Sequence, residues 1–124
     1  MSSDNIDGLM HHMRAFAQAR DWEQFHSPKN LAMAMIAECA EVVEHFQWLT
    51  EDQSYRLDDR KKEEVRLELA DVFIFLMRLA DRLQVDLVQA AYDKAAINEK
   101  RYPADRVRGD ARRASEYEGF DDGQ

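Results

Sequence analysis

Glycine, proline and cysteine are all scarce in this chain, whose 124 residues include 4 glycines, 2 prolines and 1 cysteine. Few glycines and prolines leave few places for the tight turns of a β-rich fold, and no stretch sustains the alternation of apolar and polar residues that marks a strand. The single cysteine, Cys39, excludes an intrachain disulfide. We therefore expect an all-α protein with one domain and one hydrophobic core.

The chain also has fewer basic than acidic residues and no long apolar run. The chain has 17 Lys and Arg against 25 Asp and Glu, a net charge of -8, which disfavours a nucleic-acid partner because duplex binding needs basic surface. A nucleotide whose phosphates arrive with a metal ion is compatible with this charge. No apolar run reaches the about 18 residues of a membrane span, and the start, MSSDNID, has no basic and hydrophobic leader. We expect a cytoplasmic protein without a membrane partner.

Hydrophobic periodicity predicts four helices followed by a polar tail. Ser27 is suited to cap the second helix with Pro28 in its first turn, and Asp58 or Asp59 can cap the third. The polar stretch TEDQSYRLDD between them is expected to be a loop. We divide the chain into a four-helix domain, residues 1–103, and a polar C-terminal tail, residues 104–124. The predicted helices cover about residues 4–21, 28–49, 59–83 and 87–102.

Acidic residues interrupt the apolar runs of the second and third helices at a regular spacing. Glu38 and Glu41 form one pair, and Glu68 and Asp71 form the other. Because helical residues three apart lie on one face, each pair presents two carboxylates side by side. The 26 residues between Glu41 and Glu68 allow an antiparallel return of the chain, which would bring the two pairs face to face.

Four facing carboxylates repel one another and lose water, a cost that raised pKa values or a bound cation would relieve. A divalent metal is the simpler resolution, and a ligand set of oxygens favours Mg²⁺, with Mn²⁺ as a substitute, over zinc. A ferritin-like di-iron site needs a Glu-x-x-His motif on two helices, and the third helix has no histidine. Two solvated acidic faces are the other interpretation, but Glu38 follows seven consecutive apolar residues.

Aromatic residues stand near both ends of the second helix. Trp22, Phe25 and His26 precede its start, and aromatic groups beside a metal site can hold a flat ligand by stacking, although Trp22 and Phe25 could equally fill the core. Trp48 shares the face of the acidic pair. The rest of this helix is apolar almost all round, more than one small bundle can bury, so we expect a homo-oligomer.

The fourth helix carries a polar cluster at offsets of three and four, formed by Lys94, Asn98, Arg101 and Tyr102. A cation and an amide near an anionic metal site are the counterparts that a phosphate chain needs. A solvated outer face is the plainer interpretation of the lysine alone. A hydrolase of polyphosphates suits the acidic pairs, since Mg²⁺ can bridge phosphates and activate water.

At these residues the sequence resembles the all-α MazG-like nucleoside triphosphate pyrophosphohydrolases, whose signature is Glu-x-x-Glu followed by Glu-x-x-Asp. Within that family it looks like the dCTP pyrophosphatase group. The resemblance covers roughly residues 14–109. It rests on RDWEQFHSPKNL (20–31), ECAEVVEHFQW (38–48), ELADVFIFL (68–76) and the ending Lys94, Asn98, Arg101, Tyr102, Pro103.

The resemblance implies Mg²⁺-dependent hydrolysis of dCTP or a modified dCTP between the α and β phosphates, by a four-helix unit that assembles as a dimer or tetramer with sites at subunit interfaces. Glu41, with Glu38, is assigned to the attacking water. Many relatives have two adjacent glutamates at the first motif, whereas here Ala37 takes the first place. The implied ligands are Glu38, Glu41, Glu68 and Asp71 for the metal, Trp22, His26 and Trp48 for base and sugar, and Lys94, Asn98 and Tyr102 for the phosphates.

Two alternatives stay open at this point. The same chemistry could act on dUTP or a non-canonical purine triphosphate. A non-catalytic helical oligomer that binds nucleotides or a divalent ion, or an adaptor bundle that binds neither, would also have these helices.

Overall fold

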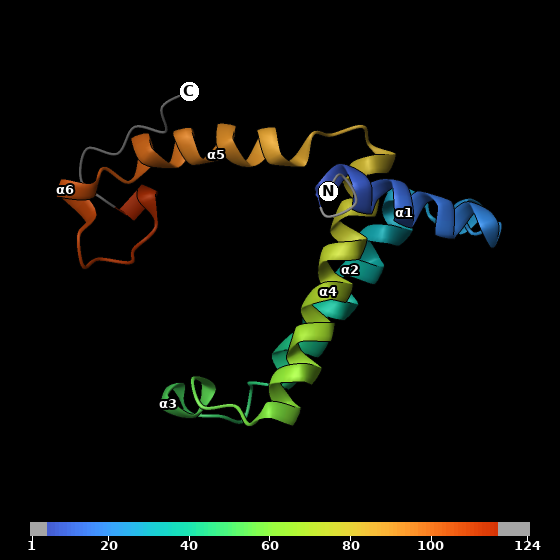
Figure 1. Cartoon of the computed structure of the whole chain (residues 1–124). Helices are drawn as coiled ribbons and strands as arrows, with labels where there is room; N and C mark the ends of the chain where they lie inside the picture. The colour runs from blue at the N-terminus through green and yellow to red at the C-terminus, as the bar shows by residue number, and fades with distance from the viewer. Residues whose placement is uncertain (1–4, 117–124) are drawn as a thin grey trace. The chain divides into compact units, whose positions relative to one another are not determined.

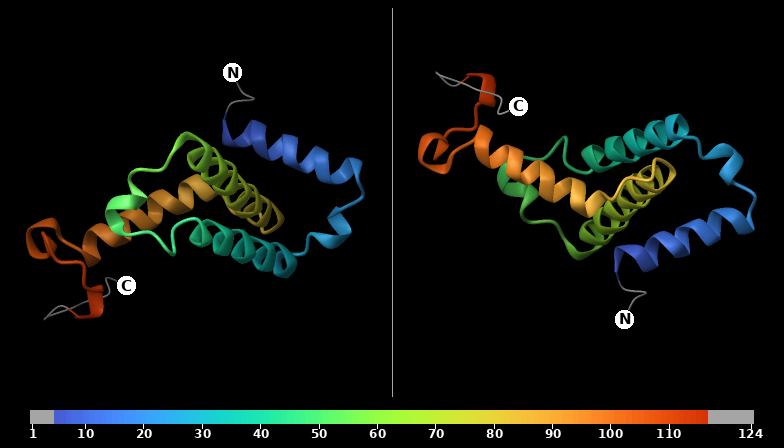
Figure 2. Two further views of the ribbon diagram at one scale, coloured as in Figure 1. Left: turned by 90° about the horizontal axis from the view of Figure 1, so that it is seen from below. Right: turned by 90° about the horizontal axis from the view of Figure 1, so that it is seen from above.

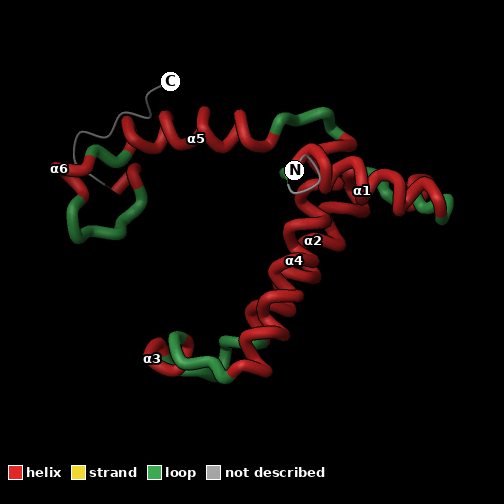
Figure 3. Tube along the Cα trace, viewed as in Figure 1, coloured by secondary structure: helices red, strands yellow, loops and turns green. Residues whose placement is uncertain are grey.

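The structure is a computed structural model that describes residues 5–116. The chain divides into two compact units, Met1–Val85 and Asp86–Gln124. Within the described residues every regular element is a helix, as the tube in Figure 3 shows. The expected all-α class is therefore confirmed. None of the helices described is long and apolar enough to cross a membrane.

The first unit contains three long helices, and each begins with a polar side chain that caps its first turn. The Asn5 side chain accepts a hydrogen bond from Gly8 N, Ser27 Oγ accepts one from Asn30 N, and Asp58 accepts one from Lys61 N. These bonds satisfy backbone N–H groups that have no partner inside the helix. The long helices are α1 Ile6–Ala19, α2 Pro28–Glu44 and α4 Asp59–Arg82 (Figure 1).

Two boundaries differ from the sequence-based expectation. Helix α2 was expected to reach residue 49 but ends at Glu44, because the chain beyond it tightens into turns in which Phe46 N donates to Val43 O. The expected loop contains a one-turn helix, α3 Glu51–Ser54. Thr50 and Gln53 form a capping box there, each side chain accepting from the other's backbone N–H.

Helix α4 lies between α1 and α2 in both views of Figure 2. The core that the three helices share is thin. The buried hydrophobic side chains of the described residues are Ala17, Leu31, Val65, Met77 and Ala80. A domain of this length ordinarily buries a larger fraction of its apolar side chains.

Large apolar side chains of α2 and α4 are correspondingly exposed. Ile36 is 65% exposed and Met33 59%, and Val43 on the same helix is 57% exposed. On α4, Leu69 and Phe73 are 53% and 39% exposed. The expectation that α2 has more apolar surface than one protomer can cover agrees with these exposures.

The second unit is built on α5 Leu87–Arg101, which Asp86 caps by accepting from Gln89 N. The Gln89 side chain donates to Asp93, one turn further along the same helix. Short helices follow, α6 Ala104–Val107 and the 3-10 turn η3 Ala114–Glu116. Both lie in the predicted polar tail, whose residues 117–124 are outside the described part. The division at residue 103 stays a prediction.

An ion pair joins α1 to α4. Arg14 Nη2 lies 2.6 Å from Asp81 Oδ1, and Arg14 Nε donates to Asp81 Oδ2 at 3.1 Å, so the guanidinium engages both carboxylate oxygens. The side chain of Asp81 is only 16% exposed. The hydrogen bond from Arg14 lowers the pKa of Asp81, which favours its charged form.

We predict that Asp81→Asn destabilises the protein by about 1 to 3 kcal/mol, because it removes a charge-assisted, partly buried pair. Glu63→Gln breaks the pair with Arg66 on the same helix and should cost much less, because solvent screens an exposed pair. Because the pKa of Asp81 is lowered in the folded state, its contribution is present above the ordinary pKa of aspartate and is lost as the pH falls below it. Urea unfolding at neutral and acid pH measures both effects, and equal losses in the two variants would contradict the prediction.

Candidate metal and nucleotide site

Helices α2 and α4 run antiparallel and bring acidic side chains together. Glu38 and Glu41 on α2 and Glu68 on α4 each offer one carboxylate oxygen, and these oxygens all lie within 4.8 Å of one another. The pairing is antiparallel because His45, further along α2, contacts Lys61, which precedes Glu68 on α4. We call these three glutamates the acidic cluster. Its spacing suits a shared cation.

Asp71, the fourth predicted ligand, lies outside this group of oxygens. It is exposed, one turn of α4 beyond Glu68, and its charge adds to the effects that raise the pKa of Glu38. The structure therefore places it close enough to act electrostatically on the acidic cluster. Its role as a ligand stays a prediction.

The pKa values show the cost of packing these carboxylates without a cation. The adjacent carboxylate of Glu41, together with burial and the carboxylate of Glu38, raises the pKa of Glu68 to about 8. Burial is the main cause that raises the pKa of Glu38, with Glu41 and Asp71 adding to it. Without a cation, Glu68 therefore holds a proton at neutral pH.

Two oxygens of the acidic cluster have no hydrogen-bond partner. Glu38 Oε2 and Glu68 Oε1 are buried, and no donor among the described residues reaches either atom. Buried carboxylate oxygens are ordinarily satisfied by a donor, a water or a cation. A hard divalent ion such as Mg²⁺ or Mn²⁺, which takes oxygen ligands, fits this donor set.

The aromatic connector before α2 forms its own cluster. The Trp22 ring lies edge-on to Phe16 at 5.8 Å between centroids and to His26 at 6.4 Å. Trp22 N donates to Ala17 O, which anchors the connector to the end of α1. Trp22 is 44% exposed and Phe25 59%. Neither side chain is buried in the core, so both rings are accessible to a ligand.

Trp48 lies past the opposite end of α2 and is 87% exposed. Helix α2 has 17 residues and at the usual rise is about 25 Å long. One protomer therefore does not bring Trp48 together with Trp22 and His26, as a shared base pocket within a single chain would require.

The predicted phosphate ligands are on α5 in the second unit. Lys94 and Asn98 are exposed, and Tyr102 is half-buried at the C-terminal end of the helix. The Asn98 carbonyl accepts from Tyr102 N at 2.8 Å. Spacings of four residues place the three side chains on one side of α5.

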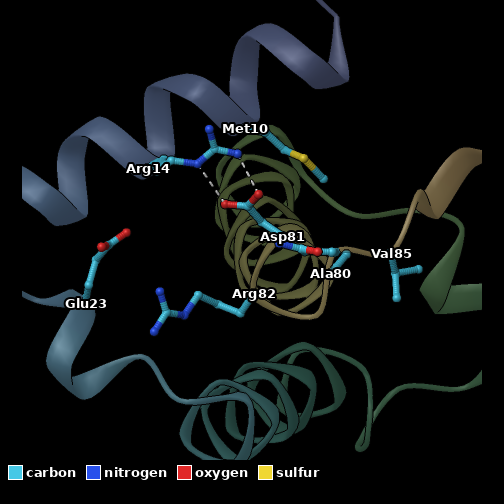
Figure 4. Close-up of a pocket in the computed structure, with 8 residues that line it drawn as sticks. Met10, Arg14, Glu23, Ala80, Asp81, Arg82 and Val85 are labelled. Atoms are coloured by element: carbon cyan, nitrogen blue, oxygen red, sulfur yellow. Dashed lines mark hydrogen bonds and ion pairs between the residues drawn. The ribbon is translucent and has the colours of Figure 1, made fainter.

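Several charged residues around the connector were not singled out in the sequence. The group consists of Arg14, Arg78, Asp81 and Arg82. The feature of the sequence that could have revealed it is Arg78, a lone charge inside the apolar run VFIFLMRLA. A cavity of about 480 Å³ adjoins this group and shares no residue with the acidic cluster. Figure 4 shows the cavity, which is lined by Met10, Arg14, Glu23, Ala80, Asp81, Arg82, Gln84 and Val85.

Residues 33–116 match the MazG-like family. This chain belongs to that family. Human dCTP pyrophosphatase 1 is 43% identical to it over 103 residues, which cover 82% of this chain and 61% of the human protein. The mouse protein of the same name is 44% identical over 98 residues, 77% of this chain and 58% of the mouse protein. This MazG-like chain thus spans about three fifths of the length of these curated relatives.

A solved structure has the same fold. A pyrophosphatase from Archaeoglobus fulgidus superposes on the MazG-like chain with a TM-score of 0.75 and 38% sequence identity, covering 78% of this chain and 91% of the other. The predicted family and its helical architecture are confirmed by these comparisons.

We predict that the metal-free protein loses stability as the pH rises from about 4.5 to about 8. Over this range the folded state holds a proton on Glu68 that the unfolded chain has released, so the contribution is fully present below the ordinary pKa of glutamate and is lost as the pH rises through the folded-state pKa of about 8. Mg²⁺ should restore the melting temperature at high pH. Glu68→Gln should flatten the pH dependence and weaken the effect of Mg²⁺, whereas Glu63→Gln should change neither. Melting temperatures with and without Mg²⁺ test this, and a flat wild-type profile in the absence of metal would contradict it.

Proposed function

We propose that this protein is a Mg²⁺-dependent nucleoside triphosphate pyrophosphohydrolase that cleaves dCTP or a modified dCTP between the α and β phosphates. The products are the monophosphate and pyrophosphate, and the role is sanitation of a cytoplasmic nucleotide pool. The relatives are named dCTP pyrophosphatases, which supports the reaction and the cytosine nucleotide. The observation that carries the proposal is the acidic cluster, with its two buried oxygens that lack partners.

The chain's own residues have distinct parts in this reaction. Glu38, Glu41, Glu68 and Asp71 would hold the metal, which would supply positive charge to offset that of the phosphates. Glu41 is the exposed member of the acidic cluster, so we assign it to orient the attacking water and accept its proton, with Glu38 beside it. The water oxygen forms a bond to phosphorus as the anhydride linkage between the α and β phosphates breaks, and the monophosphate and pyrophosphate leave. Lys94, Asn98 and Tyr102 contact the phosphates.

The base pocket needs a second copy of the chain. Trp22 and His26 lie at one end of α2 and Trp48 at the other, about 25 Å away. A homodimer or homotetramer that packs the exposed apolar side of α2 against a second protomer can place Trp48 of one chain near Trp22 and His26 of the next. The same contact would cover Met33, Ile36 and Val43.

The purified protein with Mg²⁺ should convert dCTP to dCMP and pyrophosphate. Glu38→Gln should lower kcat by about 100-fold or more, because it removes a charge at the metal, while Glu63→Gln should leave the rate unchanged. A panel that includes dUTP and non-canonical purine triphosphates, compared by kcat/KM, identifies the base. Orthophosphate as product would refute the proposal. Saturable binding without turnover would favour the non-catalytic nucleotide-binding oligomer.

We also predict a mass in solution of two or four times the 14.5 kDa protomer. Ile36→Glu places a charge on the exposed apolar side of α2 and should shift the protein toward monomer and abolish hydrolysis, since Trp48 then loses its partners. Gln18→Glu adds the same acid on α1 and is the matched control. Light scattering coupled to gel filtration measures the mass, and an active monomeric wild type would contradict the shared pocket.

A further inference from the structure

Arg78 is the one buried charged side chain among the described residues, with 4% of its surface exposed. It lies on α4 inside an apolar run, where an aliphatic residue would pack without cost. Burying a guanidinium is expensive unless its donors are paired. The groups that surround it therefore indicate what it does.

Three side chains face the Arg78 guanidinium. Nη1 donates to Asp81 Oδ2 at 3.3 Å, and Nη2 lies 3.8 Å from Glu23 Oε1 and 3.4 Å from His26 Nδ1. Asp81 is already held by Arg14 (Figure 4). The negative charges of Asp81 and Glu23 compensate the buried positive charge. The third contact, with His26, joins the guanidinium to the aromatic connector before α2.

The contact with His26 decides the tautomer of the imidazole. A guanidinium can only donate hydrogen bonds, so His26 Nδ1 must be the acceptor and carry no proton. A neutral ring with a bare Nδ1 carries its hydrogen on Nε2. His26 therefore has one hydrogen-bond donor, Nε2–H, and Arg78 makes no contact with that nitrogen.

The charges around His26 keep the ring neutral. Arg78 and Arg82 of α4 and Glu23 of η2 Glu23–Phe25 face it. Burial, followed by the two arginines, lowers the pKa of His26, and Glu23 acts in the opposite direction. Arg82 Nε also donates to the His26 carbonyl at 3.1 Å, so both arginines hold this residue of the connector against α4.

We infer that Arg78 is a positioning residue for nucleotide recognition, which it performs by fixing His26 as the Nε2–H tautomer so that the imidazole donates to an acceptor atom of the bound base. This inference rests on the proposed function, in which His26 belongs to the base pocket. Cytosine presents suitable acceptors at its ring nitrogen N3 and its carbonyl oxygen. Arg78 itself touches no substrate.

The tautomer can be measured without any nucleotide. Long-range ¹H–¹⁵N spectra distinguish a protonated imidazole nitrogen from a bare one, and a His26→Gln variant assigns the signals. We expect a bare Nδ1 in the wild type. In Arg78→Met we expect mixed tautomers and a higher pKa of His26, because one neighbouring positive charge is removed. Arg66→Met, which removes an exposed arginine of the same helix, should change neither. A protonated Nδ1 in the wild type, or an unchanged ring in Arg78→Met, would overturn the inference.

Kinetics then test the link to recognition. Arg78→Met should raise KM for dCTP by about 3- to 10-fold, the range expected for one lost hydrogen bond, with kcat within about twofold, and Arg78→Lys should recover part of the loss. Circular dichroism verifies that the variants fold. If Arg78 acts through His26, the double variant should have the KM of His26→Gln alone. Additive effects in the double variant, or a fall in kcat alone, would overturn the inference.

The two proposals can fail separately. A protein that hydrolyses no triphosphate refutes the proposed function while the spectra still report the Arg78 and His26 contact. A protein that hydrolyses dCTP with His26 in the other tautomer keeps the function and loses the role of Arg78.

Discussion

The interface between α2 and α4 contains both carboxylates and apolar side chains. Leu31, Val65 and Met77 are buried, and Glu38, Glu41 and Glu68 are gathered within a few ångströms of one another beside them. Hydrophobic burial favours the approach of the two helices, while repulsion among the glutamates opposes it. A proton on Glu68 relieves this repulsion in the free protein, and a divalent ion would relieve it more completely. Stability and metal affinity are therefore properties of one contact.

Helix α2 carries acidic site residues on one side and an exposed apolar surface on the other. One side presents Glu38 and Glu41 to α4, and the other presents Met33, Ile36 and Val43 to solvent. The aromatic residues at its two ends lie too far apart to enclose one base within a single protomer. In the proposed oligomer the contact that covers the apolar side also completes the site, so assembly and substrate recognition depend on the same residues.

The connector between α1 and α2 is held from several directions. Trp22 N is bound to the end of α1, Ser27 caps α2, and the arginines of α4 engage His26. The left-handed conformation of Asp21, with φ of 52°, turns the chain between α1 and this connector. A segment restrained in this way can present an aromatic surface without reorganising when a ligand binds, which lowers the entropic cost of binding.

Local sequence determined much of this protein. Ser27 and Asp58 marked two helix starts because a cap depends on a backbone N–H only three positions away. The three-residue spacing of the acids placed each pair on one helical face. The family was recognisable from the same motifs.

Packing between distant segments decided the rest. The alignment of α2 and α4 decides which acids form the acidic cluster and leaves Asp71 outside it. The contact of His26 with Arg78 joins residues 52 positions apart, and no periodicity in the sequence encodes such a pairing. Helical spacing is set by short-range backbone geometry and is visible in the sequence, whereas the choice of partners depends on the long-range fit of side chains, which only the folded chain specifies.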